Sequence, residues 1–326
     1  MTRLNLVALF LLASPLLLMA DSLLVLNKDD AAMVIIDPAN GKIMATVPVG
    51  EGPHELVTDT AGKLAFASNY GTGPKPGSTI SVIDLAAGRE VHRVDVSPMK
   101  RPHGLYFADG KLYFTAEANK VIGRYDPVEN RVDWILGTGQ ETTHMVMLSK
   151  DLHQIYTANI SGNSISIFDL DPKRGWLQTV VPVGRGPEGF DVSPNGRELW
   201  AAQSQDGGVS IVDLRTKAVI GVFNAGTQRS NRLKFTPDGR RILISDITSG
   251  EVAVFDVVTR KELKRVSVGK NPEGILIVPD GSRAYVAVNG ENFLAVIDLK
   301  KFEVVGRVEP GKGPDGIAWV GGGAGR

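Results

Sequence analysis

The sequence predicts an all-β fold, a seven-bladed β-propeller of four-stranded blades. A short motif recurs seven times, glycine is abundant at 37 residues, and aromatic residues make up 6% of the chain. Short apolar runs are separated by Asn-Gly and Asp-Gly turns, which favour hairpins because both central residues tolerate positive φ. Repeats of about 40 to 50 residues with such strands are typical of propeller blades.

The repeated motif has a polar third residue, often preceded by proline and followed by glycine. Its copies begin at Gly52, Arg101, Thr142, Gly186, Arg229, Asn271 and Gly313, and successive third residues are 41 to 49 positions apart. Later in each unit a strand ends in aspartate, at Asp37, Asp84, Asp126, Asp169, Asp213, Asp256 and Asp298. We expect these aspartates to make turns rather than a site.

The two ends of the chain complete one blade in this prediction. The last motif leaves room for only one strand, near residues 316–320, whereas residues 22–48 contain three strands with no motif before them. One C-terminal strand would therefore pair with three N-terminal strands and leave no long sheet edge open. Residues 21–326 would form a single propeller domain.

The first twenty residues have the pattern of a secretory signal peptide. Arg3 precedes an apolar run over residues 4–19, and Ala20 fits a cleavage site. An uncleaved anchor is the alternative, but the run is short for a membrane span. With no cysteine in the chain, we expect a bacterial periplasmic or secreted protein, monomeric and without a stable membrane span after cleavage near Ala20.

The charge balance argues against nucleic acid as a partner. The chain has 36 basic and 36 acidic residues, so its formal net charge is zero. Binding to a nucleic acid backbone draws on an excess of basic residues. Any charge-based ligand must therefore be recognised locally.

The repeats resemble the YVTN family of bacterial β-propellers, through residues 64–70, 155–159 and 284–289. That resemblance implies a propeller fold. Residues 52–56 and 68–71 also resemble the seven-bladed lactonase family, which includes 6-phosphogluconolactonases and muconate-cyclising enzymes. The later blades lack the Arg and His pattern of that family, so its catalytic residues are not transferred.

The third motif residues are expected to form a ring at one mouth of the central channel. This ring contains His54, His103, His144, Glu188, Asn231, Glu273 and Asp315. Because antiparallel neighbours place the end of one strand beside the start of the other, a second ring is expected about fifteen residues later. Its members are Asn69, Glu117, Asn159, Gln203, Asp246 and Val288, with Asn27 from the closing blade.

Three histidines on adjacent blades suggest a metal site. His54, His103 and His144 could bind Zn²⁺ and leave a position for water or substrate. The candidate general bases are Glu117, Glu188 and Glu273. Ca²⁺ or Mg²⁺ bound by carboxylates is an alternative, and polar residues that simply border a water-filled channel are another.

Other polar residues near the mouth are candidates for binding substrate. A carboxylate or phosphate could be received by Arg101, Arg185 and Arg232. Further candidate contacts are Asn69, Asn159, Asn231, Asp246 and Asp315. An insertion at residues 70–78 could be a lid or a specificity loop, or a simple variation in length.

These observations leave two main functional hypotheses. The first is a metal-assisted hydrolase, lactonase-like, or a lyase, acting on a small anionic molecule. The second is a non-catalytic periplasmic binding or scaffold protein that docks a ligand or protein on the same face. A copper redox site is a third reading, which neither a cysteine nor a haem-attachment motif supports.

Overall fold

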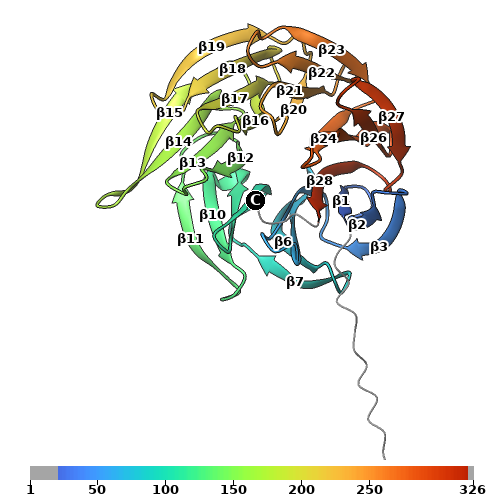
Figure 1. Cartoon of the computed structure of the whole chain (residues 1–326). Coiled ribbons are helices and arrows are strands. Elements are labelled where there is room, and N and C mark those ends of the chain that lie inside the picture. Colours follow the sequence, from blue (N-terminus) through green and yellow to red (C-terminus); the bar gives the residue numbers. More distant parts are fainter. Residues whose placement is uncertain (1–20, 322–326) are drawn as a thin grey trace, which may run out of the picture.

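Seven four-stranded antiparallel sheets surround a central axis in the computed structural model, which describes residues 21–321 (Figure 1). We call the sheets blades A to G in ring order. The predicted fold class is confirmed. The predicted signal peptide, residues 1–20, lies outside the described residues.

In every blade the four strands follow one another from the channel outward. Blade A contains β28 (Pro314–Val320), β1 (Ser22–Asn27), β2 (Ala32–Asp37) and β3 (Lys42–Pro48); blade B contains β4 (Pro53–Thr58), β5 (Leu64–Gly71), β6 (Pro76–Asp84) and β7 (Arg89–Asp95). Blade C contains β8 (Pro102–Ala108), β9 (Lys111–Ala116), β10 (Val121–Asp126) and β11 (Arg131–Gly137); blade D contains β12 (Thr143–Leu148), β13 (Gln154–Asn159), β14 (Ser164–Asp171) and β15 (Gly175–Pro182).

The remaining blades follow the same order. Blade E contains β16 (Pro187–Val192), β17 (Glu198–Gln203), β18 (Gly208–Asp213) and β19 (Ala218–Asn224); blade F contains β20 (Ser230–Phe235), β21 (Arg241–Asp246), β22 (Glu251–Asp256) and β23 (Glu262–Ser267); blade G contains β24 (Pro272–Ile277), β25 (Arg283–Val288), β26 (Phe293–Asp298) and β27 (Glu303–Val308). Two short 3-10 helices are η1 (Glu117–Asn119) and η2 (Asn289–Glu291). Over residues 21–321, no helix has the length and apolar character needed to cross a membrane.

The two ends of the described chain meet in blade A, as predicted. Strand β28 is antiparallel to β1, with Leu23 opposite Trp319 and Val25 opposite Ile317. Figure 1 shows the red β28 beside the blue β1. This pairing covers the edge that β1 would otherwise expose.

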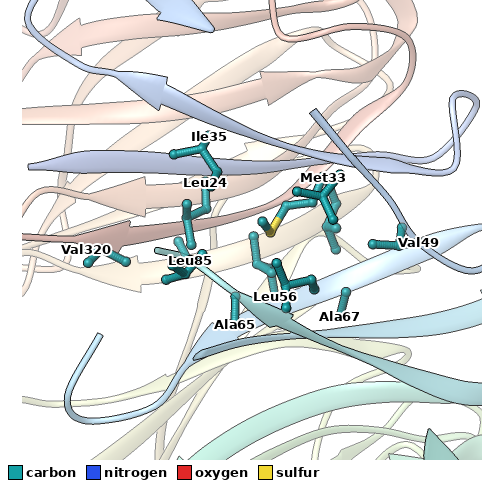
Figure 2. Close-up of a cluster of buried hydrophobic side chains, with 13 residues drawn as sticks. Leu24, Met33, Ile35, Val49, Leu56, Ala65, Ala67, Leu85 and Val320 are labelled. Carbon is teal, nitrogen blue, oxygen red and sulfur yellow. The ribbon is translucent and has the colours of Figure 1, made fainter. Parts of the chain in front are cut away.

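Apolar side chains between neighbouring blades form the core. Every residue of β1 is buried, whereas the outer strand β3 is mostly exposed. Figure 2 shows one such cluster, in which Leu24 and Met33 of blade A meet Leu56 and Ala67 of blade B. A cluster of this kind lies at each of the other six blade boundaries, so apolar packing joins every blade to both of its neighbours.

Glycine at the fourth motif position lets the inner strands approach each other closely. A β-carbon on Gly274 would lie 2.1 Å from the carbonyl oxygen of Asp315, and one on Gly104 would lie 2.6 Å from that of His144. Real β-carbons do not come so near to backbone oxygens. The Pro-x-Gly part of the motif therefore reflects the crowding of strands at the channel.

The repeated aspartates make turns in most blades. Oδ1 of Asp37 accepts a hydrogen bond from the backbone N–H of Ala39 at 2.9 Å, and similar bonds occur in other blades. Blade D departs from the prediction because β14 continues for two further residues. Asp171 accepts the N–H of Lys173 there at 2.8 Å, while Asp169 instead binds Gln154 at 2.8 Å.

Removal of residues 313–326 should destroy cooperative folding, because β1 would lose the strand on its inner side and expose a largely apolar edge. Removal of residues 322–326 alone is the control and should leave the melting transition intact. Circular dichroism melting and size-exclusion chromatography make the comparison. A soluble, cooperatively melting 1–312 fragment would contradict the closure of blade A.

Candidate functional site

A cavity of about 180 Å³ lies at the channel mouth on the face where the inner strands begin. All seven residues of the predicted first ring line it, which are His54, His103, His144, Glu188, Asn231, Glu273 and Asp315. Its other lining residues are Lys28, Tyr70, Arg229, Arg232 and Ile247. The predicted ring is therefore one continuous surface.

A local irregularity of the inner strands brings these side chains together. In blade B the pairing of β4 with β5 runs from Pro53 opposite Asn69 to Leu56 opposite Ala67, with a register shift between them. Blades C, E, F and G show the same shift at the same motif position. The third and fourth motif residues are thus released from the regular ladder, as in a β-bulge.

The histidines occupy one half of the cavity. The ring centroids of His103 and His144 are 3.8 Å apart, and those of His54 and His103 are 5.2 Å apart. Tyr70 lies against His54, with ring centroids 4.7 Å apart. His103 and His144 are 3% and 7% exposed, so bulk water reaches them little.

Hydrogen bonds determine which ring nitrogens remain available. Nδ1 of His144 contacts a carboxylate oxygen of Glu117, and Nδ1 of His54 contacts the carbonyl oxygen of Gly52 at 2.9 Å. Both acceptors require the proton on Nδ1, which leaves Nε2 with a lone pair. Nε2 of His144 and Nδ1 of His103 are buried without a hydrogen-bond partner.

These atoms are suited to binding a metal ion. His103, Glu117 and His144 offer ligand atoms within 4.8 Å of one another. A carboxylate bound to the far nitrogen of a ligating histidine is a common outer-shell arrangement. The sequence predicts a cluster of His54, His103 and His144, whereas in the structure Glu117 takes the place of His54 in this group.

The pKa values of two histidines favour neutral imidazoles, the form that binds metals. Burial, assisted by the charge of Lys28, lowers the pKa of His54 to about 4. Burial and the neighbouring His144 hold the pKa of His103 well below its usual value. Although burial opposes ionisation of Glu117, hydrogen bonds from His144 and Tyr70 lower its pKa overall.

Carboxylates and one lysine form the other half of the cavity. Nζ of Lys28 lies 2.6 Å from Oε2 of Glu273 and 3.0 Å from Oδ2 of Asp315. One ammonium cannot neutralise two carboxylates. Lys28 and nearby cations lower the pKa of the buried Asp315 despite its burial, whereas burial and repulsion from Asp315 raise the pKa of Glu273 to about 7.

An ion pair crosses the channel between blades B and F. The guanidinium of Arg232 binds Glu55, and both occupy the fourth motif position, where most blades have glycine. Arg232 also donates to Asn231 at 3.3 Å, and Asn231 donates to Glu188 at 2.7 Å. Glu55 is not among the site residues predicted from the sequence, although its charge is opposite to that of Arg232 at the same repeat position.

The predicted substrate-binding arginines do not offer free guanidinium groups to the cavity. Arg232 is paired with Glu55. Arg101 donates to the carbonyl oxygen of Gly73 at 3.1 Å, and Arg185 donates to that of Gln205 at 3.2 Å. Neither Arg101 nor Arg185 lines the cavity.

Three predicted polar contacts of the second ring instead bind other parts of the chain, and two of them, Asn69 and Asp246, hold loops between blades. Asn69 accepts the N–H of Gly50 at 3.0 Å, and Asp246 accepts that of Arg229 at 2.9 Å. Asn159 donates to Ser166 at 3.0 Å. Within this ring, Glu117 differs because its carboxylate binds Tyr70 and His144 rather than its own loop.

A larger cavity of about 550 Å³ lies on the opposite face, between blades D and E. It is lined by Gln154, Gly196, Arg197, Asp213, Leu214 and Arg215. This set contains no histidine and a single carboxylate. The histidines and most of the carboxylates that could bind a metal ion or transfer a proton therefore line the smaller cavity.

A profile of the YNCE-like β-propeller family matches residues 112–283. The chain belongs to this family. The resemblance to bacterial repeat propellers noted in the sequence is thereby confirmed.

Named relatives of this family member are distant. Antigen Lp49 of Leptospira interrogans is 26% identical over 235 residues, which cover 65% of this chain but only 49% of Lp49. A 6-phosphogluconolactonase of Enterobacter sp. is 22% identical over 269 residues, covering 74% of this chain and 80% of that enzyme. This confirms a distant resemblance to the lactonase propellers.

Solved structures support the same fold. The periplasmic gluconolactonase PpgL of Pseudomonas aeruginosa has a TM-score of 0.76 at 16% identity, and the match covers 92% of this chain and 99% of PpgL. At this identity the likeness concerns the fold.

Replacement of Arg232 by methionine should lower the free energy of unfolding by about 3 kcal/mol, because Glu55 would stay buried without its partner. Adding Glu55→Leu should recover most of that loss, since the unpaired charge is then gone. Urea unfolding of the two variants measures both steps. A loss in the single variant that the second substitution does not relieve would contradict this role of the ion pair.

The raised pKa of Glu273 predicts a pH-dependent stability. Between its ordinary pKa of 4.5 and its folded value of about 7, the folded state holds a proton that the unfolded state has released. The contribution of Glu273 to the free energy of unfolding should therefore fall as pH rises through this range, by on the order of 2 kcal/mol, while the lowered pKa values of His54 and His103 act in the opposite direction. Glu273→Gln should remove that fall, and equal pH slopes for both proteins in urea unfolding would refute it.

Proposed function

We propose that this protein is a metal-assisted hydrolase of small lactones or esters. The observation that carries the proposal is the buried cluster of His103, Glu117 and His144 at the cavity, where two imidazole nitrogens lack hydrogen-bond partners. A buried, unpartnered nitrogen is costly unless a ligand binds it. A divalent ion bound by these two imidazoles, with Zn²⁺ the best match to nitrogen ligands, would satisfy both.

The residues around the cluster have separate tasks in this proposal. His103 and His144 hold the ion, which supplies Lewis-acid polarisation of a carbonyl group and lowers the pKa of bound water. Glu117 orients His144 and so is a positioning residue rather than a general base. His54, with Nε2 unprotonated, borders the same half and could complete the ligand set.

The carboxylate half suits proton transfer and substrate recognition. Glu273 has a pKa of about 7, so it can accept or donate a proton near neutral pH. Glu188 is held by Asn231 at 2.7 Å and is the second candidate base. Carboxylates accept hydrogen bonds from hydroxyl groups, so Glu188, Glu273 and Asp315 favour a hydroxyl-bearing substrate.

The charges around the cavity favour a neutral substrate over the anionic one expected from the sequence. Lys28 is already paired with Glu273 and Asp315, and Arg232 with Glu55. Arg229 lines the cavity as the remaining cationic side chain.

The small volume of about 180 Å³ fits a single-ring molecule. The similarity to 6-phosphogluconolactonase and the name of PpgL support lactones as the first compounds to test, and the proposed export places them in the periplasm or outside the cell.

His103→Ala and His144→Ala should each weaken zinc binding by at least about 100-fold, because each removes a ligand. His153→Ala is the control, since His153 is exposed on the opposite face. Elemental analysis of natively purified protein and a chelator competition assay measure binding. Wild-type protein without stoichiometric metal would contradict the proposal.

A paired screen of neutral and phosphorylated sugar lactones, with and without chelator, tests the activity itself. We expect chelator-sensitive hydrolysis that is faster for the neutral member of each pair. Metal-free protein with no turnover, together with a co-purifying protein partner, would favour the non-catalytic docking hypothesis instead.

A further inference from the structure

The insertion of blade B is a folded hairpin extension. Gly71 pairs with Pro76 at the end of β5 and β6, and the N–H of Thr72 donates to the carbonyl oxygen of Lys75 at 2.9 Å. Lys75 also lies 3.3 Å from Glu51. The loop therefore has a defined conformation next to the cavity.

Arg101 fastens this extension to blade C. Its guanidinium donates to the carbonyl oxygens of Thr72 at 3.4 Å and Gly73 at 3.1 Å. The same group lies over the ring of Tyr70, 4.8 Å from the ring centroid, a cation–π contact. Its backbone N–H donates to Gly77 at 2.9 Å. Arg101 thus holds the insertion at both its start and its end.

Tyr70 connects the insertion to the histidine cluster. Its hydroxyl donates to Oε2 of Glu117 at 2.5 Å, and Oε1 of Glu117 contacts Nδ1 of His144. Burial and the charge of Glu117 raise the pKa of Tyr70 to about 12, so the hydroxyl remains a donor. Both carboxylate oxygens of Glu117 are therefore occupied, one from blade B and one from blade D.

We propose that Tyr70, clamped by Arg101, is a positioning residue that fixes Glu117 and thereby the orientation and tautomer of His144. An ionised carboxylate accepts hydrogen bonds only, so His144 must carry its proton on Nδ1 and present Nε2. On this inference the insertion is part of the histidine site rather than a simple variation in length. The inference deepens the proposed function, since the same histidine would hold the ion.

The test compares Tyr70→Phe and Arg101→Gln with wild-type protein by ¹⁵N NMR of labelled histidines. Metal-free protein is measured at about pH 8.5, above the ordinary histidine pKa. The Nδ1–H form of His144 should dominate in the wild type, and the Nε2–H form should gain population in both variants. Tyr156→Phe and Arg265→Gln are matched controls, because they remove a buried hydroxyl bond and an arginine–carbonyl bond far from the site.

An unchanged His144 tautomer in both variants, with the fold intact by circular dichroism, would overturn the inference. Should Tyr70→Phe fail to fold, Arg101→Gln decides, because glutamine retains the β-carbon and aliphatic stem but loses the guanidinium. Zinc affinity should also fall about tenfold in either variant. A wild type that binds no zinc would defeat the proposed function, while the tautomer measurement would still decide the role of Tyr70.

Discussion

Pairing of β28 with β1 is the constraint on which the rest of the structure depends. It joins the two ends of the described chain in one blade and fixes the circumference of the ring. The same blade supplies Lys28 and Asp315 to the cavity. Closure and site are therefore linked, because an open ring would separate Lys28 from Glu273 and leave the carboxylate half without its cation.

Within the closed ring, the close approach of the inner strands determines which side chains reach the cavity. Glycine at the fourth motif position lets backbones touch, and the third residues are thereby directed to a common cavity. Glu55 and Arg232 stand at the fourth motif position, where most blades have glycine. They carry opposite charges and form an ion pair across the channel. This buried pair lies beside Asn231 and Glu188, so it links the stability of the channel to the geometry of the site.

The repeat carried most of the predictive information. The spacing of the motif was enough to predict seven blades, the closing blade and all seven first-ring residues, because each follows from strand register. It did not reveal Lys28, which lies in a turn of the closing blade with no counterpart in the motif. Nor could the motif show that Glu117 has a different role from Asn69, because the two residues occupy the same repeat position. They differ in their hydrogen-bond partners, since Asn69 binds the preceding loop and Glu117 binds Tyr70 and His144.

The proposed function requires His103 and His144 to bind a metal ion. Anomalous diffraction from crystals soaked with zinc, collected on both sides of the zinc absorption edge, tests it most directly. We expect one strong peak about 2.1 Å from an imidazole nitrogen of each histidine. A strong peak elsewhere, or none at the cavity, would contradict it.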